Sequence, residues 1–320
     1  MTCTPPPLDP AIAAALAADP DAVVGMEPED IAVIRGRAVP VPAEQVTRYG
    51  TFERTDLTFP SAADGADVRV VLVRPARTSG PLPVIVHIHG GGLVLGGPLD
   101  DLPATLELAA HTGCAVASVD YRLAPEHPYP TPVLDCYGAL TGLHDVAREW
   151  NLDPTRMILS GVSAGGGLAA AVALWGRDHD GPDLLGLLLA CPMLDDRNET
   201  FSARQMRGVG TWDLTANATG WRAYLGDAAG GPDVPIYAAP GRAQDLSGLP
   251  PTFVDVATVE TFRDECVAFA SRIWQAGGSA ELHVWPGGNH AFDFLAPWAT
   301  LSQDARASRL AWLRRLLLDA

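Results

Sequence analysis

A serine lies at the centre of a glycine-flanked pentapeptide, Gly161-Val162-Ser163-Ala164-Gly165. Residues 156–160 before it are typical of a buried strand, and residues 165–175 after it are typical of a helix. In a strand–turn–helix of this kind, the glycines allow a tight turn that lifts the serine hydroxyl above the sheet. The start of the helix also favours negative charge. The pattern therefore predicts that Ser163 is a nucleophile.

A histidine that could act as its general base follows much later, in Gly287-Gly288-Asn289-His290. Three carboxylates compete to orient the imidazole of His290: Asp255, Glu260 and Asp264. Asp255 falls inside a predicted strand, and Asp264 falls in the first turn of a predicted helix, where it could equally cap that helix. Glu260 lies on the loop between them, so its position favours it as the acid of a serine–histidine–acid triad. Asp255 and Asp264 remain alternatives.

A second glycine-rich turn, His89-Gly90-Gly91-Gly92, follows the apolar run 84–88 directly. Backbone N–H groups that carry no side chain can point into a cavity and bind the oxyanion of a tetrahedral intermediate. We expect Gly91 and Gly92 to be oxyanion donors together with the N–H of Ala164. We expect His89 and Gly90 to support that loop.

Two other chemistries fit parts of the sequence less well. Residues 165–170 match the loose dinucleotide pattern G-x-G-x-x-A, but the match lies in mid-chain and overlaps the serine turn. His87 and His89 would share one face of a strand and could bind a metal ion. No third ligand completes a recognisable zinc set. We therefore expect neither a metal nor a cofactor.

The elements that would position these groups alternate along the chain, which is typical of an α/β fold with a mostly parallel sheet covered by helices. We predict eight strands, at residues 54–59, 68–74, 83–89, 115–120, 156–160, 184–190, 252–257 and 280–285. We predict helices at residues 11–18, 102–111, 136–149, 165–175, 263–276 and 302–318.

The alternation stops at two places, which together suggest a helical cap. Residues 1–45 precede the first strand, and residues 195–247 form an insertion too long and too apolar for a bare loop. We expect both segments to pack together over the sheet, leaving a catalytic core of residues 46–194 and 248–320. Leu93, Trp212 and Trp221 could bind substrate, although aromatic residues at helical spacing also form the core of a cap.

Composition excludes some partners. The net charge of −16 would repel phosphate backbones and anionic lipid surfaces, so we expect no nucleic acid and no membrane partner. The five scattered cysteines suit reduced thiols, and no apolar stretch reaches the length of a membrane span. We therefore expect a cytoplasmic protein that acts on a small molecule. The last strand could form an open edge that pairs two subunits in a homodimer.

The chain resembles the hormone-sensitive-lipase-like bacterial esterases, also called family IV of the α/β-hydrolase superfamily. The matching segments span most of the chain in the order of the family: residues 89–92, Asp120-Tyr121-Arg122-Leu123-Ala124-Pro125-Glu126-His127-Pro128, the serine turn, Phe262-Arg263-Asp264-Glu265, and the His290 loop. The resemblance implies a capped α/β-hydrolase fold, activity on short acyl esters and no cofactor.

The resemblance also has two departures and leaves alternatives. Many members have aspartate where this chain has Val162, and most have a catalytic aspartate where it has Glu260. A glutamate keeps the charge and acceptor geometry, so we expect a serine carboxylesterase. An amidase or deacetylase would share the acyl-enzyme chemistry, and a plant hormone receptor of the same family lacks the catalytic histidine. Since Ser163 and His290 are both present, we expect an enzyme.

Overall fold

Eight strands form one twisted sheet in the computed structural model, which describes residues 4–19 and 24–318. The strand order is β1-β2-β4-β3-β5-β6-β7-β8. The pairs β1–β2 and β2–β4 are antiparallel, and the remaining pairs are parallel. The strands are β1 (Phe52–Pro60), β2 (Asp67–Pro75), β3 (Leu82–Ile88), β4 (Ala115–Asp120), β5 (Leu152–Val162), β6 (Gly186–Ala190), β7 (Thr252–Val259) and β8 (Ala280–Asn289). The predicted eight-stranded, mostly parallel sheet is confirmed.

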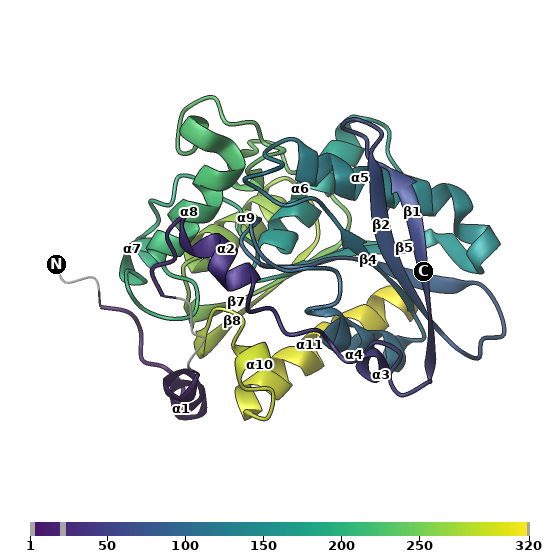
Figure 1. Ribbon diagram of the computed structural model, residues 1–320, viewed down its shortest axis with the longest axis horizontal. Helices are drawn as coiled ribbons and strands as arrows, with labels where there is room; N and C mark the ends of the chain where they lie inside the picture. The colour runs from purple at the N-terminus through teal and green to yellow at the C-terminus, as the bar shows by residue number, and fades with distance from the viewer. Residues whose placement is uncertain (1–3, 20–23, 319–320) are drawn as a thin grey trace.

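The central strands are apolar because helices cover both of their faces. Every residue of β3 and β6 is buried, whereas β8 at the edge of the sheet is largely half-exposed. One face packs on α4 (Leu102–Thr112) and α11 (Thr300–Leu318), and the other packs on α5 (Thr131–Val146), α6 (Ala164–Asp178) and α9 (Arg263–Gln275) (Figure 1). The parallel strands therefore end together at one edge, where the loops that carry the predicted site lie.

Shorter helices lie over this edge and along the N-terminal segment. They are α1 (Pro10–Ala18), α2 (Asp30–Arg35), α3 (Ala43–Val46), α7 (Phe201–Gln205), α8 (Leu214–Leu225) and α10 (Phe292–Leu295). The 3₁₀ turns are η1 (Ala147–Trp150), η2 (Gly226–Ala228) and η3 (Pro240–Arg242).

The N-terminal segment contacts both the insertion and the sheet domain. The N–H of Gly25 donates to Asp213 Oδ1 of the insertion at 3.2 Å. In contrast, the N–H of Asp9 donates to the carbonyl of Gly287 at 2.9 Å, so α1 is held against the end of β8. Figure 1 shows α2 beside α8 and α1 near α10. The predicted domain boundaries stay a prediction.

Differences from the predicted elements are confined to their ends. Helix α5 begins at Thr131 rather than at residue 136, because Pro132 suits the first turn of a helix. Strand β5 begins at Leu152, earlier than predicted.

Among residues 4–19 and 24–318, no helix combines the length and apolar character needed to cross a bilayer. The described cysteines, 114, 136, 191 and 266, are free and buried, and Cys3 lies outside the described residues.

Candidate active site

Ser163 lies at the turn between β5 and α6, and its backbone is in a conformation that L-residues rarely adopt, with φ 56° and ψ −121°. A methyl group on Gly161 would collide with the backbone of Gly165. A methyl group on Gly165 would collide with the carbonyl of Ile88. Only glycine therefore fits at both positions, and the turn holds the serine side chain at the carboxyl edge of the sheet.

The imidazole of His290 joins the serine to an acid. Its Nε2 lies 3.0 Å from Ser163 Oγ, and its Nδ1 lies 2.9 Å from Glu260 Oε2. All three side chains are buried. With the proton on Nδ1, the imidazole donates to the carboxylate and leaves Nε2 free to accept the serine proton. The other oxygen of Glu260 accepts the N–H of Phe262 at 3.2 Å, which fixes the carboxylate plane.

The two other carboxylates bond to different partners. Asp255 lies inside β7, where its Oδ2 accepts from Arg309 at 2.9 Å. Asp264 lies in the first turn of α9 and accepts the N–H of Ser202 at 2.8 Å. Among the hydrogen bonds of the described residues, His290 bonds to Glu260 and to neither of the other two candidates.

The surroundings of His290 raise its pKa. Burial alone would lower the pKa, but the negative charge of Glu260, the neighbouring Cys191 and the hydrogen bonds to both together outweigh burial and hold the pKa well above its ordinary value of 6.5. The buried thiol of Cys191 also lies beside this pair, and burial raises the pKa of that thiol. Cys191, Glu260 and His290 each offer one possible metal-ligand atom, and these atoms lie within 4.8 Å of one another. Both imidazole nitrogens already face protein partners, however.

The glycine loop after β3 presents unused backbone donors next to the serine. No hydrogen bond in the described part of the chain uses the N–H of Gly91, Gly92 or Ala164. A methyl group on Gly91 would collide with the carbonyl of Leu95, and one on Gly92 would collide with the ring of Trp212. Gly91 and Gly92 therefore fit only as glycine, and both line the cavity at Ser163.

His89 and Gly90 are braced from below, as expected for supports of the loop. The ring of His89 stacks on Tyr121 with centroids 4.2 Å apart, and the Tyr121 hydroxyl donates to the His89 carbonyl at 3.0 Å. The N–H of Gly90 donates to Asp101 Oδ2 at 3.2 Å, while Asp101 Oδ1 pairs with His87 at 2.9 Å. Burial lowers the pKa of His89, which keeps its imidazole neutral. Because Asp101 bonds to both His87 and the N–H of Gly90, His87 braces the loop through Asp101.

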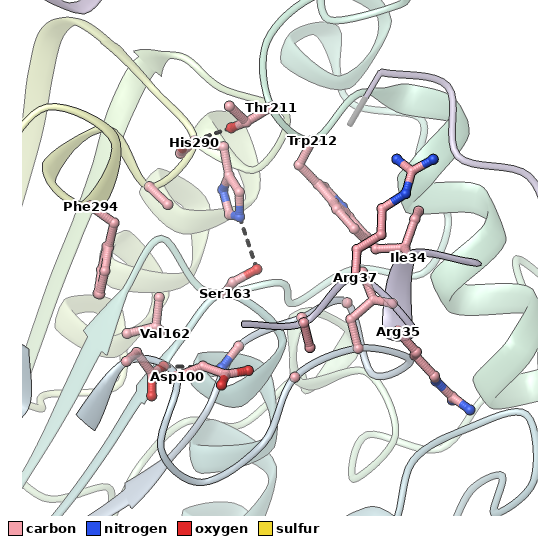
Figure 2. A pocket seen from close by; sticks show the side chains of 18 residues that line it. Ile34, Arg35, Arg37, Asp100, Val162, Ser163, Thr211, Trp212, His290 and Phe294 are labelled. Carbon is pink, nitrogen blue, oxygen red and sulfur yellow. Dashed lines mark hydrogen bonds between the residues drawn. The ribbon is translucent and has the colours of Figure 1, made fainter. Parts of the chain in front are cut away.

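A cavity of about 530 Å³ opens above Ser163 and His290. Figure 2 shows Trp212, Ile34 and Arg37 on one side of the serine, and Val162 and Phe294 on the other. Trp212 lines the cavity. Leu93 and Trp221 are buried in the core and are not among the residues that line this cavity, and their binding of substrate stays a prediction.

Sequence reasoning missed several residues that shape the site. Ile34 and Thr211 come from segments that carry no motif, whereas Asp101 and Phe294 lie close in sequence to the glycine loop and to His290 but match no pattern that would mark them. Tyr121 lies in the matched segment 120–128, which marked it without giving its role. Thr211 of the insertion donates to the carbonyl of His290 at 2.8 Å, so the insertion helps to hold the histidine loop.

Known proteins match this chain over its whole length. A family described as having the alpha/beta hydrolase fold matches residues 85–294. Carboxylesterase NlhH of Mycobacterium tuberculosis is 33% identical over 319 residues, which cover 99% of this chain and 98% of that protein. A bacterial heroin esterase superimposes with a TM-score of 0.87 at 37% identity, covering 97% of this chain and 98% of the other. Esterase LipW of Mycobacterium marinum gives 0.83 at 35% identity, with 99% of both chains covered.

The match covers the glycine loop, the serine turn and the histidine loop, and the sheet topology agrees with it. The resemblance inferred from the motifs is confirmed by these relatives. The chain belongs to the α/β-hydrolase family and, within it, to the hormone-sensitive-lipase-like group of esterases.

Proposed function

We propose that this protein is a serine carboxylesterase that hydrolyses short-chain acyl esters through a Ser163–His290–Glu260 triad and an acyl-enzyme intermediate. The observation that carries the proposal is the unbroken hydrogen-bond chain from Ser163 Oγ through His290 to Glu260, at the base of an open cavity. The relatives named carboxylesterase and esterase support the ester bond as the target.

Acylation begins when His290 Nε2 takes the proton of Ser163 as Oγ bonds to the ester carbonyl carbon. The carbonyl oxygen becomes an oxyanion, which the N–H groups of Gly91, Gly92 and Ala164 stabilise. When the intermediate collapses, the bond to the alcohol oxygen breaks, and the alcohol leaves with the proton from His290. The carboxylate of Glu260 accepts the hydrogen bond from His290 Nδ1 and stabilises the transient imidazolium.

Deacylation repeats these steps with water. His290 removes a proton from a water molecule as the oxygen attacks the acyl carbon, and the oxyanion again binds the glycine loop. Collapse then breaks the bond to Ser163 Oγ, which recovers its proton from His290. The carboxylic acid leaves and the enzyme returns to its starting state.

We further propose that residues 1–45 and 195–247 form a cap that limits access to the cleft. Ile34 and Arg37 of the first segment and Trp212 of the second line the same cavity, which supports this role. A cytoplasmic location and a homodimer stay predictions.

The decisive experiment is hydrolysis of p-nitrophenyl esters of graded acyl length by the wild type and by Ser163→Ala. A fluorophosphonate probe, which labels activated serines, gives a second readout by intact mass. We expect activity on acetate and butyrate esters, with both activity and labelling lost in the variant. A folded wild type that neither hydrolyses these esters nor takes up the probe would contradict the proposal and favour a receptor.

An amide substrate is the remaining alternative, because amides use the same acyl-enzyme chemistry. Labelling of Ser163 without ester hydrolysis, followed by cleavage of p-nitroacetanilide, would favour an amidase instead.

A further inference from the structure

A second cavity lies directly behind one wall of the catalytic cavity. It measures about 340 Å³ and lies between the sheet and helices α4 and α11. The two cavities share two lining residues, Val162 and Phe294. Figure 2 shows these side chains close together on the side of Ser163 that faces away from Trp212. Val162 and Phe294 therefore stand between the two spaces.

Aliphatic side chains form part of the wall of the second cavity, beside polar ones such as Thr105 and Ser160. Its walls include Ala104, Leu108, Leu188 and Ala190. The charged groups of the lining form two ion pairs, Asp293 with Arg309 at 2.6 Å and Glu107 with Arg306 at 3.5 Å. Unpaired charge would favour a polar ligand, whereas paired charges among aliphatic side chains favour burial of methylene groups.

The arrangement around Ser163 decides which end of an ester would face the partition. The carbonyl oxygen faces the glycine loop, and the alcohol oxygen must lie near His290 Nε2 to receive its proton. The remaining substituent of the carbonyl carbon is the acyl chain. The wall that neither the glycine loop nor His290 occupies includes Val162, next to Ser163 in the chain, and Phe294.

We propose that Val162 and Phe294 form a partition that sets the acyl-length limit of this enzyme. We also propose that the cavity behind it accepts linear aliphatic acyl chains of medium length once the Phe294 ring is removed. This inference rests on the proposed esterase function and names the residues that determine its specificity.

Phe294 can be truncated without removing a core residue. Phe294 is half-buried, whereas its neighbour Phe292 is buried and packs with Ala257 and Ala296. Ala104 lines the second cavity and not the first, so a larger side chain there fills the space behind the partition without touching the catalytic cavity.

The test compares kcat/KM for p-nitrophenyl acetate and octanoate in the wild type, Phe294→Ala, Ala104→Phe and the double variant. Phe294→Ala should raise the octanoate-to-acetate ratio at least about tenfold, since each buried methylene contributes a factor of about four. Ala104→Phe alone should leave acetate hydrolysis and the ratio unchanged. In the double variant the ratio should return to the wild-type value.

Three results would overturn the inference. One is an unchanged ratio in Phe294→Ala, and another is a raised ratio that persists in the double variant. The third is a shift that follows alcohol length in a series of alkyl acetates, which would assign the space to the alcohol. If Phe294→Ala does not fold, Phe294→Leu should give a smaller shift in the same direction. If the wild type does not hydrolyse p-nitrophenyl acetate either, the esterase proposal itself fails. That result differs from an active enzyme whose ratio stays unchanged.

Discussion

The α-carbon of Gly92 faces the indole ring of Trp212 so closely that a methyl group there would overlap ring carbons. Gly92 also has φ 60°, a region that favours glycine. Trp212 comes from the insertion and Gly92 from the loop after β3, so two distant segments meet at the proposed oxyanion recess. The shape of the recess depends on this contact.

Gly92→Ala should therefore lower kcat by about 10²- to 10³-fold, the usual cost of losing one oxyanion donor. The added methyl group must displace either Trp212 or the loop, and either movement misplaces the N–H. Gly97→Ala is the matched control, because nothing lies within 4 Å of a methyl group at that position. Ester hydrolysis kinetics check both variants, and equal activity of the two would refute a tight recess at Gly92.

The pH dependence should reflect the raised pKa of His290. Catalysis needs the neutral imidazole, so activity should rise with pH through a limb centred above the reference value of 6.5. Glu260→Gln removes the charge that raises the pKa, so the limb should move to lower pH while kcat falls by about 10⁴-fold.

NMR titration of the His290 ring follows this pKa even where activity is too low to measure. His290→Gln assigns the resonance, and Asp264→Asn serves as the control that should leave the titration in place. A titration of His290 that is identical in the wild type and in Glu260→Gln would show that Glu260 does not set the pKa.

Arg309 should be a major contributor to stability. Its buried guanidinium bonds to Asp255 Oδ2 at 2.9 Å and to Asp293 Oδ2 at 2.6 Å. Arg309→Leu would leave Asp255 buried without its cation and Asp293 with only the more distant Arg306 at 3.7 Å, at a cost of about 3–5 kcal/mol in the free energy of unfolding. Arg54→Ala, which breaks an exposed pair with Asp56, should cost less than about 1 kcal/mol. Urea unfolding measures both, and comparable losses would contradict the assignment.

Glu265 should make stability fall as pH rises. Burial raises the pKa of Glu265 well above its ordinary value, although its Oε1 accepts the N–H groups of Leu194 and Asp195 at 2.7 and 3.2 Å. The folded state then holds the proton more tightly than the unfolded state, so this contribution is complete below about pH 4.5. It decreases as pH rises through the folded-state pKa.

Glu265→Gln keeps an oxygen acceptor but cannot ionise, so the variant should lose this part of the pH dependence. The difference in unfolding free energy between wild type and variant should change between pH 5 and 8 in favour of the variant. Urea unfolding at several pH values measures it, and parallel stability curves would show that Glu265 does not titrate in this range.

The chemistry of the site was readable from the sequence because each motif is local. The turn around Ser163 needs small residues beside the nucleophile, and the loop at residues 90–92 needs glycine where side chains would collide. Ser163, Glu260 and His290 directly follow β5, β7 and β8, so their order along the chain is the order of these three strands. Hydrophobic periodicity predicted the eight strands, since their buried faces must be apolar.

Only the tertiary structure decided which residues surround that chemistry. Trp212 and Trp221 lie in one apolar insertion, yet Trp212 lines the cavity and Trp221 does not. No local pattern distinguishes them, because the difference depends on how α8 packs against the glycine loop. Likewise, the position of Phe294 beside Val162 depends on the path of the chain after β8. Contacts between residues far apart in sequence form only when the whole core packs, so the sequence by itself predicted the proposed reaction, and the fold decided the shape around the proposed site.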